Sequence, residues 1–343
     1  MLSRIGMAAY SRTQESRLPM GKPHVLITSI FLRPDDDVDR RLREAGFEPV
    51  YHPLVGKRTE EELIALLQGI DGAIASVDPF TDRVLAAAPQ LKVISRTGVG
   101  YDAIDVKAAT ARGVMVTTTP GVNRDAVADL ALALVLCCAR KLPENLAEVR
   151  RGGWKRHEGV DLAGKTLGIV GLGTIGKEVA QRAKAFKMQL LAYDLVQDRP
   201  FADATGVAYV SLDGLLRQSD FVSLHCFLNE TTRHLMNAER LARMKPTAYL
   251  VNTARGGLVD TEALCRALRE KRIAGAALDV TEEEPLPADD PLRAFDTVYL
   301  TPHAAGSTAD ARERSGAMAA ENLIRALRGE RPAGIVNPEV VTR

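Results

Sequence analysis

Short apolar runs that alternate with amphipathic segments are the feature that most constrains how this chain can fold. A first series of runs covers residues 24–28, 48–52, 72–76, 91–95 and 114–118, and a second covers 166–171, 189–194, 221–226, 249–254, 276–280 and 298–301. Strands that are apolar along their whole length are buried on both faces, as in a parallel sheet covered by helices. The two successive series therefore predict an α/β protein with two doubly wound parallel sheets.

The end of the first series marks a boundary between two domains. Pro120 interrupts the pattern, and a long helix is predicted over residues 123–150 with a break near Pro143. A closing helix is predicted over 308–328, and we expect it to return to the first domain and make that domain discontinuous. At about 150 residues per domain, the length also favours two domains. We expect a tail over 1–22, a first domain formed by 23–119 and 304–343, and a second domain over 120–303.

The first 20 residues differ in composition from the rest of the chain. They carry three arginines, several serines and a single acid, Glu15, but lack the apolar core of a secretory signal. This composition weakly resembles that of a transit peptide. A loose tail, or a chain whose true start is Met20, explains it more simply, and we favour that interpretation.

Charge and cysteine content exclude several classes of partner. The 45 Lys and Arg nearly balance the 44 Asp and Glu, so nothing in the net charge favours nucleic acid or an anionic membrane as a partner. The longest apolar run, 130–139, is too short to span a bilayer. Four cysteines without a CxxC pair predict neither a disulfide framework nor a metal site, and reduced thiols favour a cytoplasmic location: Cys137, Cys138, Cys226 and Cys265.

A glycine-rich turn opens the second series of strands. Gly171, Gly173 and Gly176 form a GxGxxG pattern between the predicted strand 166–171 and the predicted helix 177–186. In this context Gly171 permits a tight turn, Gly173 permits close approach of a pyrophosphate, and Gly176 permits close packing of helix on strand. The helix N-terminus offers free N–H groups to phosphates. The pattern therefore predicts a dinucleotide site.

An aspartate ends the next predicted strand. Asp194 lies 18 residues beyond Gly176, close to the ~20 residues at which a carboxylate binds the adenosine ribose. A carboxylate there repels the extra phosphate of NADP, and the following Leu195 and Val196 supply no arginine for it. A glycine turn followed by a surface aspartate is the plainer interpretation. The combination of strand, turn, helix and acid favours a cofactor site, with NAD preferred over NADP.

Three kinds of side chain suited to hydride chemistry follow later strands. Arg255 can grip a carboxylate with two hydrogen bonds, and His303 can exchange a proton near neutral pH. A carboxylate beside His303 would fix its tautomer, and the run Glu282, Glu283 and Glu284 offers three candidates that spacing alone does not separate. Taken singly, each of these residues also has a plain structural interpretation as a turn, a surface or a loop residue.

Together these residues resemble the D-isomer-specific 2-hydroxyacid dehydrogenase family, over nearly the whole chain from about residue 23. The segments that carry the resemblance are VISRTGVGYD at 93–102, TPGVNRDAVA at 119–128, GKTLGIVGLG at 164–173, and the stretch from MKP to NTARGGLVD at 244–260. The most similar members are short phosphoglycerate dehydrogenases and hydroxypyruvate reductases. The resemblance implies a flavodoxin-like substrate domain and an NAD-binding Rossmann domain with a cleft between them.

The resemblance also implies roles for the catalytic residues. Arg255 is expected to bind the substrate carboxylate and keto oxygen, and His303 to protonate that oxygen while the nicotinamide gives hydride. Glu284, which stands just before a proline and five residues past Asp279, matches the glutamate that the family pairs with its histidine. The backbone N–H groups of Val99 and Gly100 are expected to hold the substrate carboxylate.

Further cofactor contacts and a homodimer are implied in the same way. The pyrophosphate is expected at Thr174 and Ile175, and the nicotinamide end at Thr253, Ala254 and Asp279. The remaining cofactor positions implied by the resemblance are His225, Thr231 and Gly306.

The substrate is the least determined part of this prediction. Many short phosphoglycerate dehydrogenases carry an arginine after the third strand for the substrate phosphate, whereas this chain has Asp78 nearby, which would repel it. Lys57 and Arg58 could compensate. We therefore favour an enzyme that acts on the CH–OH group of an unphosphorylated small acid of the hydroxypyruvate or glyoxylate type. The alternatives are a D-3-phosphoglycerate dehydrogenase and, from another class, an NAD-sensing binding protein similar to the C-terminal-binding-protein corepressors.

Overall fold

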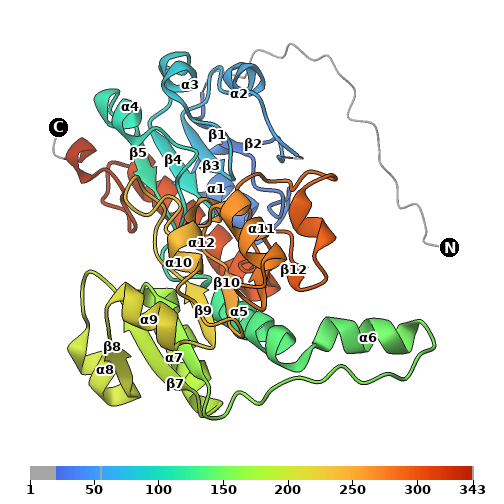
Figure 1. Cartoon of the computed structure of the whole chain (residues 1–343). Helices are drawn as coiled ribbons and strands as arrows, with labels where there is room; N and C mark the ends of the chain where they lie inside the picture. Colours follow the sequence, from blue (N-terminus) through green and yellow to red (C-terminus); the bar gives the residue numbers. More distant parts are fainter. Residues whose placement is uncertain (1–20, 55, 342–343) are drawn as a thin grey trace. The chain divides into compact units, whose positions relative to one another are not determined.

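The computed structural model describes residues 21–54 and 56–341 (Figure 1). Backbone contacts divide the chain into two compact units, and almost all of the predicted tail lies outside the described residues. The first unit holds the residues up to Arg96, Tyr101–Thr118 and the residues from Ala319, and the second holds Thr97–Gly100 and Thr119–Met318. Residues 304–318 thus group with the second unit. The domain boundaries drawn from the sequence stay a prediction.

The first unit contains a five-stranded parallel sheet in the order β2-β1-β3-β4-β5. This is the flavodoxin-like order. The strands are β1 His24–Ile27, β2 Glu48–Tyr51, β3 Gly72–Ala75, β4 Val93–Arg96 and β5 Met115–Thr117. Helices α2 Glu60–Leu66, α3 Asp82–Ala86 and α4 Val106–Ala111 cover one face. The other face packs against α1 Asp37–Glu44 and the C-terminal half of α12 Ala309–Leu327.

The second unit contains a seven-stranded parallel sheet in the order β12-β11-β10-β9-β6-β7-β8. The strands are β6 Thr166–Val170, β7 Gln189–Tyr193, β8 Val207–Tyr209, β9 Phe221–Leu224, β10 Tyr249–Asn252, β11 Gly275–Leu278 and β12 Val298–Leu300. The topological switch lies between β6 and β9. Strands β7 and β8 follow on one side of β6, and the chain then crosses to the other side to form β9 to β12. Ligands of such sheets bind at the carboxyl ends of the strands at this point.

Helices cover both faces of this second sheet. One apolar core joins it to α5 Arg124–Arg140 and α7 Thr174–Ala185, and another joins it to α9 Leu212–Gln218 and α11 Thr261–Arg269. The remaining elements of this unit are α6 Leu142–Arg150, α8 Arg199–Thr205, α10 Ala238–Leu241 and the 3₁₀ helices η1 Gly256–Leu258 and η2 Pro291–Ala294. The predicted α/β class with two parallel sheets is confirmed.

Two local features show how well the sequence predicted the elements. The helix expected over 123–150 is interrupted as predicted, because Lys141 takes a left-handed conformation between α5 and α6 and Pro143 lies in the first turn of α6. Strand β8 was not predicted. It has only three residues, pairs with β7 alone at the edge of the sheet, and has an exposed residue at its centre, so it lacks a continuous apolar run. Within the described residues, no helix is both long and apolar enough to cross a membrane.

Candidate active site

The glycine loop connects β6 to α7 at the topological switch. Gly171 has a φ of +95°, and a Cβ there would lie 2.7 Å from the backbone nitrogen of Cys226. A Cβ on Gly176 would lie 2.1 Å from the carbonyl oxygen of Gly171, so the fold itself requires both glycines. A Cβ on Gly173 would meet no atom within 4 Å. The loop is therefore open at the position where a phosphate would approach the backbone.

The N-terminus of α7 faces the same turn. Gly173 is the N-cap residue, and no side chain caps the helix. Thr174 and Ile175 begin the first turn, so their N–H groups lie at the positive end of the helix dipole. This arrangement suits an anionic group, and the pyrophosphate contact expected there stays a prediction.

Asp194 lies at the carboxyl end of β7 and is tied to the glycine loop. Its Oδ2 accepts a hydrogen bond from the Leu172 N–H at 2.7 Å, and its Oδ1 accepts one from the Val196 N–H at 3.1 Å. A carboxylate oxygen can accept more than one hydrogen bond, so Asp194 can also accept from ribose hydroxyls. Leu195 and Val196 are more than three-quarters exposed beside it.

Three further predicted cofactor residues lie at strand ends and loops of this unit. Burial of the His225 ring lowers the pKa of this side chain to about 4, and its Nε2 pairs with Ser223 Oγ at 2.8 Å. Thr231 is exposed and donates its hydroxyl to Asn229. Thr253 follows β10, and its buried Oγ1 has no hydrogen-bond partner among the described residues. An orphaned hydroxyl and the open glycine turn both fit a bound dinucleotide.

His303 and Glu284 form a direct pair. His303 Nδ1 lies 2.7 Å from Glu284 Oε2, and Glu284 Oε1 accepts a hydrogen bond from the Thr281 N–H at 3.2 Å. Of the three candidate glutamates, Glu284 is the one that contacts His303. The other ring nitrogen of His303, Nε2, has no hydrogen-bond partner in the described part of the chain and is open to a substrate.

The pair also sets the ionisation state of Glu284. Burial would raise the pKa of this carboxyl, but the hydrogen bond and charge of His303, the Thr281 N–H and the charge of Arg255 together lower it below the ordinary value. Glu284 is therefore ionised at neutral pH. An ionised carboxylate can only accept a hydrogen bond, so His303 Nδ1 carries the proton between them.

Asp279 holds the turn that carries His303. Its buried carboxylate accepts three hydrogen bonds, from the Thr301 hydroxyl at 2.6 Å and from the N–H groups of Ala304 and Ala305 at 2.8 and 2.9 Å. Its carbonyl oxygen accepts from the His303 N–H at 2.8 Å. The sequence did not reveal this supporting role, because it depends on the pairing of β11 with β12. The nicotinamide contact expected of Asp279 stays a prediction.

The backbone at Arg255 is fixed by the buried side chain of Asn252. Asn252 Nδ2 donates to the carbonyl oxygen of Arg255 at 2.8 Å, and its Oδ1 accepts from the Ala254 N–H at 3.0 Å. A Cβ on the next residue, Gly256, would lie 1.9 Å from the carbonyl oxygen of Thr281. The loop that carries Glu284 therefore packs directly against the backbone beside Arg255.

The remaining predicted residues belong to the same unit. The Thr119 N–H donates to the Gly98 carbonyl oxygen at 3.0 Å. This hydrogen bond joins the segment of Val99 and Gly100 to the rest of the second unit. In the described residues, the N–H groups of Val99 and Gly100 donate to no protein acceptor, so they are available to an anion. Gly306 lies against Asn123, with 3.1 Å between an ideal Cβ and the Asn123 Nδ2.

Comparisons with known proteins agree with this geometry. The sequence model for the "D-isomer specific 2-hydroxyacid dehydrogenase, NAD binding domain" matches residues 132–305. A glyoxylate reductase of Korarchaeum cryptofilum is 51% identical over 77% of this chain and 81% of its own length. A D-3-phosphoglycerate dehydrogenase of Methanocaldococcus jannaschii is 44% identical over 88% of this chain and 57% of its own. The crystal structure of the TT0316 protein of Thermus thermophilus, 42% identical, superposes with a TM-score of 0.84 over 91% of this chain and 99% of that one.

The chain belongs to the D-isomer-specific 2-hydroxyacid dehydrogenase family. It is therefore an oxidoreductase that acts on 2-hydroxy acids and uses a nicotinamide cofactor. The family resemblance stated from the sequence is confirmed.

The contacts of Asp78 in the first unit correct the argument that this residue would repel a substrate phosphate. Asp78 was expected to present a free negative charge, but its side chain is fully buried and forms an ion pair with Arg58, whose side chain is 9% exposed. The Thr28 hydroxyl donates to the same carboxylate. Asp78 therefore cannot repel a phosphate as a free anion, and Arg58 is not a free cation. Only tertiary packing could reveal this pair, because Arg58 and Asp78 lie 20 residues apart.

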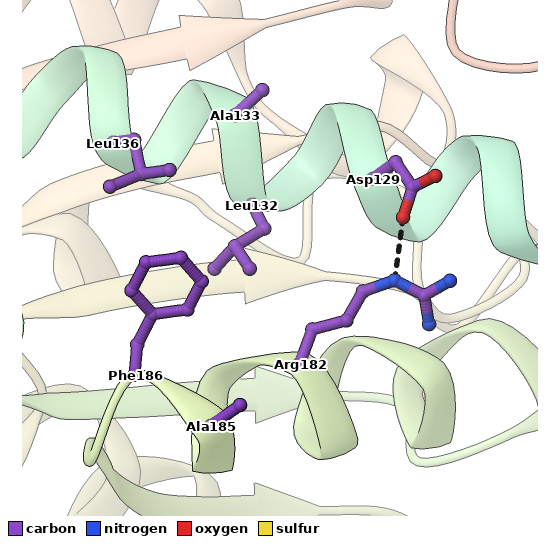
Figure 2. A pocket seen from close by; sticks show the side chains of 7 residues that line it. All are labelled: Asp129, Leu132, Ala133, Leu136, Arg182, Ala185 and Phe186. Atoms are coloured by element: carbon purple, nitrogen blue, oxygen red, sulfur yellow. Dashed lines mark hydrogen bonds and ion pairs between the residues drawn. The ribbon is translucent and has the colours of Figure 1, made fainter.

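A separate hollow of about 340 Å³ lies between α5 and α7 of the dehydrogenase (Figure 2). Arg182 reaches across it to Asp129 at 2.6 Å, and it also bonds Asp125 and Glu178. Three carboxylates thus neutralise Arg182. None of the predicted site residues lines this hollow, so it is not a candidate for the reaction site.

Proposed function

We propose that this dehydrogenase transfers hydride between NADH and the keto carbon of a small 2-ketoacid of the hydroxypyruvate or glyoxylate type. The contact of 2.7 Å between His303 Nδ1 and Glu284 Oε2 carries this proposal. It orients the proton donor His303 through Glu284, whose loop packs against the backbone beside Arg255. A cation for the carboxylate and a proton donor for the oxygen are what ketoacid reduction requires of the protein.

Each group then has one task in the reaction. Arg255 binds the substrate carboxylate and polarises the keto oxygen, and the N–H groups of Val99 and Gly100 donate to the carboxylate. The bound nicotinamide supplies the hydride to the keto carbon. His303 Nε2 gives its proton to the keto oxygen, which becomes the hydroxyl, while Glu284 stabilises the positive ring from the Nδ1 side.

An unphosphorylated substrate is supported by the state of Arg58. This cation is already paired with Asp78 and donates to the His52 carbonyl oxygen as well, so it is not free for a substrate phosphate. The similarity to a glyoxylate reductase points the same way. Exposed Lys57 and the similarity to a phosphoglycerate dehydrogenase favour the second candidate, D-3-phosphoglycerate oxidation.

NAD is the proposed cofactor. Gly171, Gly173 and Gly176 with the first turn of α7 would hold the pyrophosphate. Asp194 would hold the adenosine ribose and repel the 2′-phosphate of NADP. The proposed contacts at the nicotinamide end and the adenine side are those expected from the sequence: Thr253, Ala254, Asp279, Gly306, His225 and Thr231.

A homodimer is proposed from the exposed apolar surface of the α6 arm. Helix α6 and the segment after it extend away from the rest of their unit (Figure 1), and Leu146, Val149 and Trp154 are 59%, 57% and 80% exposed on them. Apolar patches of this kind are typical of protein interfaces. All four cysteines are unpaired, which fits the proposed cytoplasmic location.

The deciding experiment compares substrates side by side. Initial rates of NADH oxidation are measured with hydroxypyruvate, glyoxylate and 3-phosphohydroxypyruvate, and each is repeated with NADPH. Faster turnover of the unphosphorylated acids with NADH supports the proposal. Faster turnover of 3-phosphohydroxypyruvate assigns the protein to phosphoglycerate oxidation, equal use of NADPH refutes the cofactor preference, and NADH binding without any turnover supports the corepressor-like alternative.

A further inference from the structure

A second histidine–glutamate pair lies on the loop that carries Glu284. His234 Nε2 lies 2.7 Å from Glu282 Oε1, and Arg233 Nη2 lies 3.7 Å from the same oxygen. The other oxygen of Glu282 accepts a hydrogen bond from the N–H of Thr261, the first residue of α11, at 3.1 Å. Both oxygens of Glu282 are thus anchored, although Glu282 is not the glutamate that contacts His303.

His234 is itself fixed to the segment that follows Arg255. The His234 N–H donates to the Gly257 carbonyl oxygen at 2.8 Å. Two residues later, the Met236 N–H donates to Leu258 at 2.9 Å, and Met236 forms a parallel β-bridge with Val259. The backbone around His234 is therefore held in register with the residues just after Arg255.

We propose that His234 is a positioning residue: with Glu282 it ties the loop of Glu284 to the segment of Arg255 and so fixes the geometry of the reacting groups. The proposal rests on the function proposed above and deepens it. Within the described residues, His234 forms no hydrogen bond or ion pair with Glu284 or His303.

The geometry explains why a single tie can control the active pair. Glu282 and Glu284 are two residues apart, and the Thr281 N–H that bonds Glu284 lies at the start of the same loop. The Thr281 carbonyl packs against Gly256 with no room for a side chain. The loop thus has a fixed contact at Thr281 and a second one at Glu282. Without His234, Glu282 keeps only the Thr261 N–H on its other oxygen and Arg233 at 3.7 Å, so the loop of Glu284 can shift relative to Arg255. A displacement of about 1 Å in a reacting group can cost up to about 100-fold in rate.

The loop provides a matched control. Glu283 stands between the two paired glutamates, and its side chain makes no hydrogen bond or ion pair in the described residues. Its carbonyl oxygen accepts from the Thr281 hydroxyl at 2.7 Å, a contact that a side-chain change leaves in place. Like Glu282→Ala, Glu283→Gln therefore removes one negative charge from this loop, but it leaves the contact between His234 and Glu282 in place.

The test measures kcat and KM for the 2-ketoacid in five variants of the full-length protein, one of which is Glu282→Ala alone. His234→Ala is expected to lower kcat about tenfold, with the Kd for NADH and the thermal midpoint unchanged. His234→Gln keeps an N–H donor for Glu282 and is expected to stay within about twofold of the wild type, as is Glu283→Gln. Glu282→Ala combined with His234→Ala is expected to be no worse than the more damaging single change, because both break the same contact.

Hydrogen exchange of the Thr281 amide gives a readout that does not depend on turnover. This amide is expected to exchange at least about fivefold faster in His234→Ala and at the wild-type rate in Glu283→Gln. If the wild type reduces no 2-ketoacid, the proposed function fails, and the exchange rate alone decides whether the tie exists. Wild-type kcat and wild-type Thr281 exchange in His234→Ala would overturn the inference, as would a loss of kcat that His234→Gln does not restore.

Discussion

Replacement of Glu284 by glutamine tests how much the carboxylate contributes to the proton donor. The amide keeps the size of the side chain and an oxygen that can accept from His303 Nδ1, but it removes the negative charge. A hydrogen bond to a charged group contributes about 1.5–3 kcal/mol and a neutral one about 0.5–1.5 kcal/mol, so loss of the charge alone costs about 1–1.5 kcal/mol. The side chains of Glu284 and His303 are 38% and 47% exposed, so solvent screening favours the lower end of that range. A loss of about 1 kcal/mol corresponds to a fall of about fivefold in kcat/KM.

The charge of Glu284 also predicts the direction in which kcat/KM changes with pH, and the same variant tests it. The pKa of Glu284 lies below its ordinary value in the folded protein, despite burial, because His303, the Thr281 N–H and Arg255 favour the ionised form. Its contribution to catalysis and to stability is therefore complete above the ordinary glutamate pKa and is lost as the pH falls through the lowered value. Glu284→Gln should lack this loss on the acid side.

The assay is steady-state oxidation of NADH by hydroxypyruvate across the pH range, with NADH binding measured separately by fluorescence. Wild-type kcat/KM at neutral pH in Glu284→Gln would refute the reasoning, since the variant retains the geometry and lacks only the charge. An unchanged acid limb would show that another group controls the rate at low pH.

Other substitutions test the cofactor site and the first unit. Gly176→Ala places a Cβ 2.1 Å from the Gly171 carbonyl oxygen, so we expect a loss of about 1–3 kcal/mol in unfolding free energy, measured by urea denaturation; wild-type stability would contradict the packing. Asp194→Ala should raise kcat/KM with NADPH relative to NADH by at least about tenfold, in rates with both cofactors, because the repelling charge is gone; an unchanged ratio would contradict the role of Asp194. Asp78→Ala leaves Arg58 buried without its partner and should cost about 3–5 kcal/mol of stability, and an unchanged thermal midpoint would contradict that pairing.

The fold and the glycine loop were predictable because their signals are local. Continuous apolar runs report burial on both faces of a strand. Gly176 is required by a contact within one strand–turn–helix unit, and Gly171 by the positive φ of the turn itself. Edge strand β8 was missed for the converse reason, since a short strand with one neighbour needs no apolar run. An element is thus predictable from the sequence when residues close to it in the chain determine its burial and its backbone conformation.

The supporting contacts of the site could not be predicted, because they join residues that are far apart in the chain. Asp279 bonds the turn of His303 across a strand pair, and His234 bonds Glu282 over 48 positions. The argument from Asp78 failed for the same reason. A charge read from the sequence is treated as free, whereas the fold buries Asp78 against Arg58 and cancels it. Charged residues are therefore the ones whose sequence-based interpretation most needs a structure.

The most direct test of the proposed chemistry is the rate of NADH oxidation by hydroxypyruvate in His303→Ala beside the wild type. If His303 is the proton donor, the variant should turn over about 10²–10⁴-fold more slowly while it binds NADH as tightly as the wild type. Equal rates in the two proteins would contradict the proposed role of His303 and, with it, the mechanism built on its pair with Glu284.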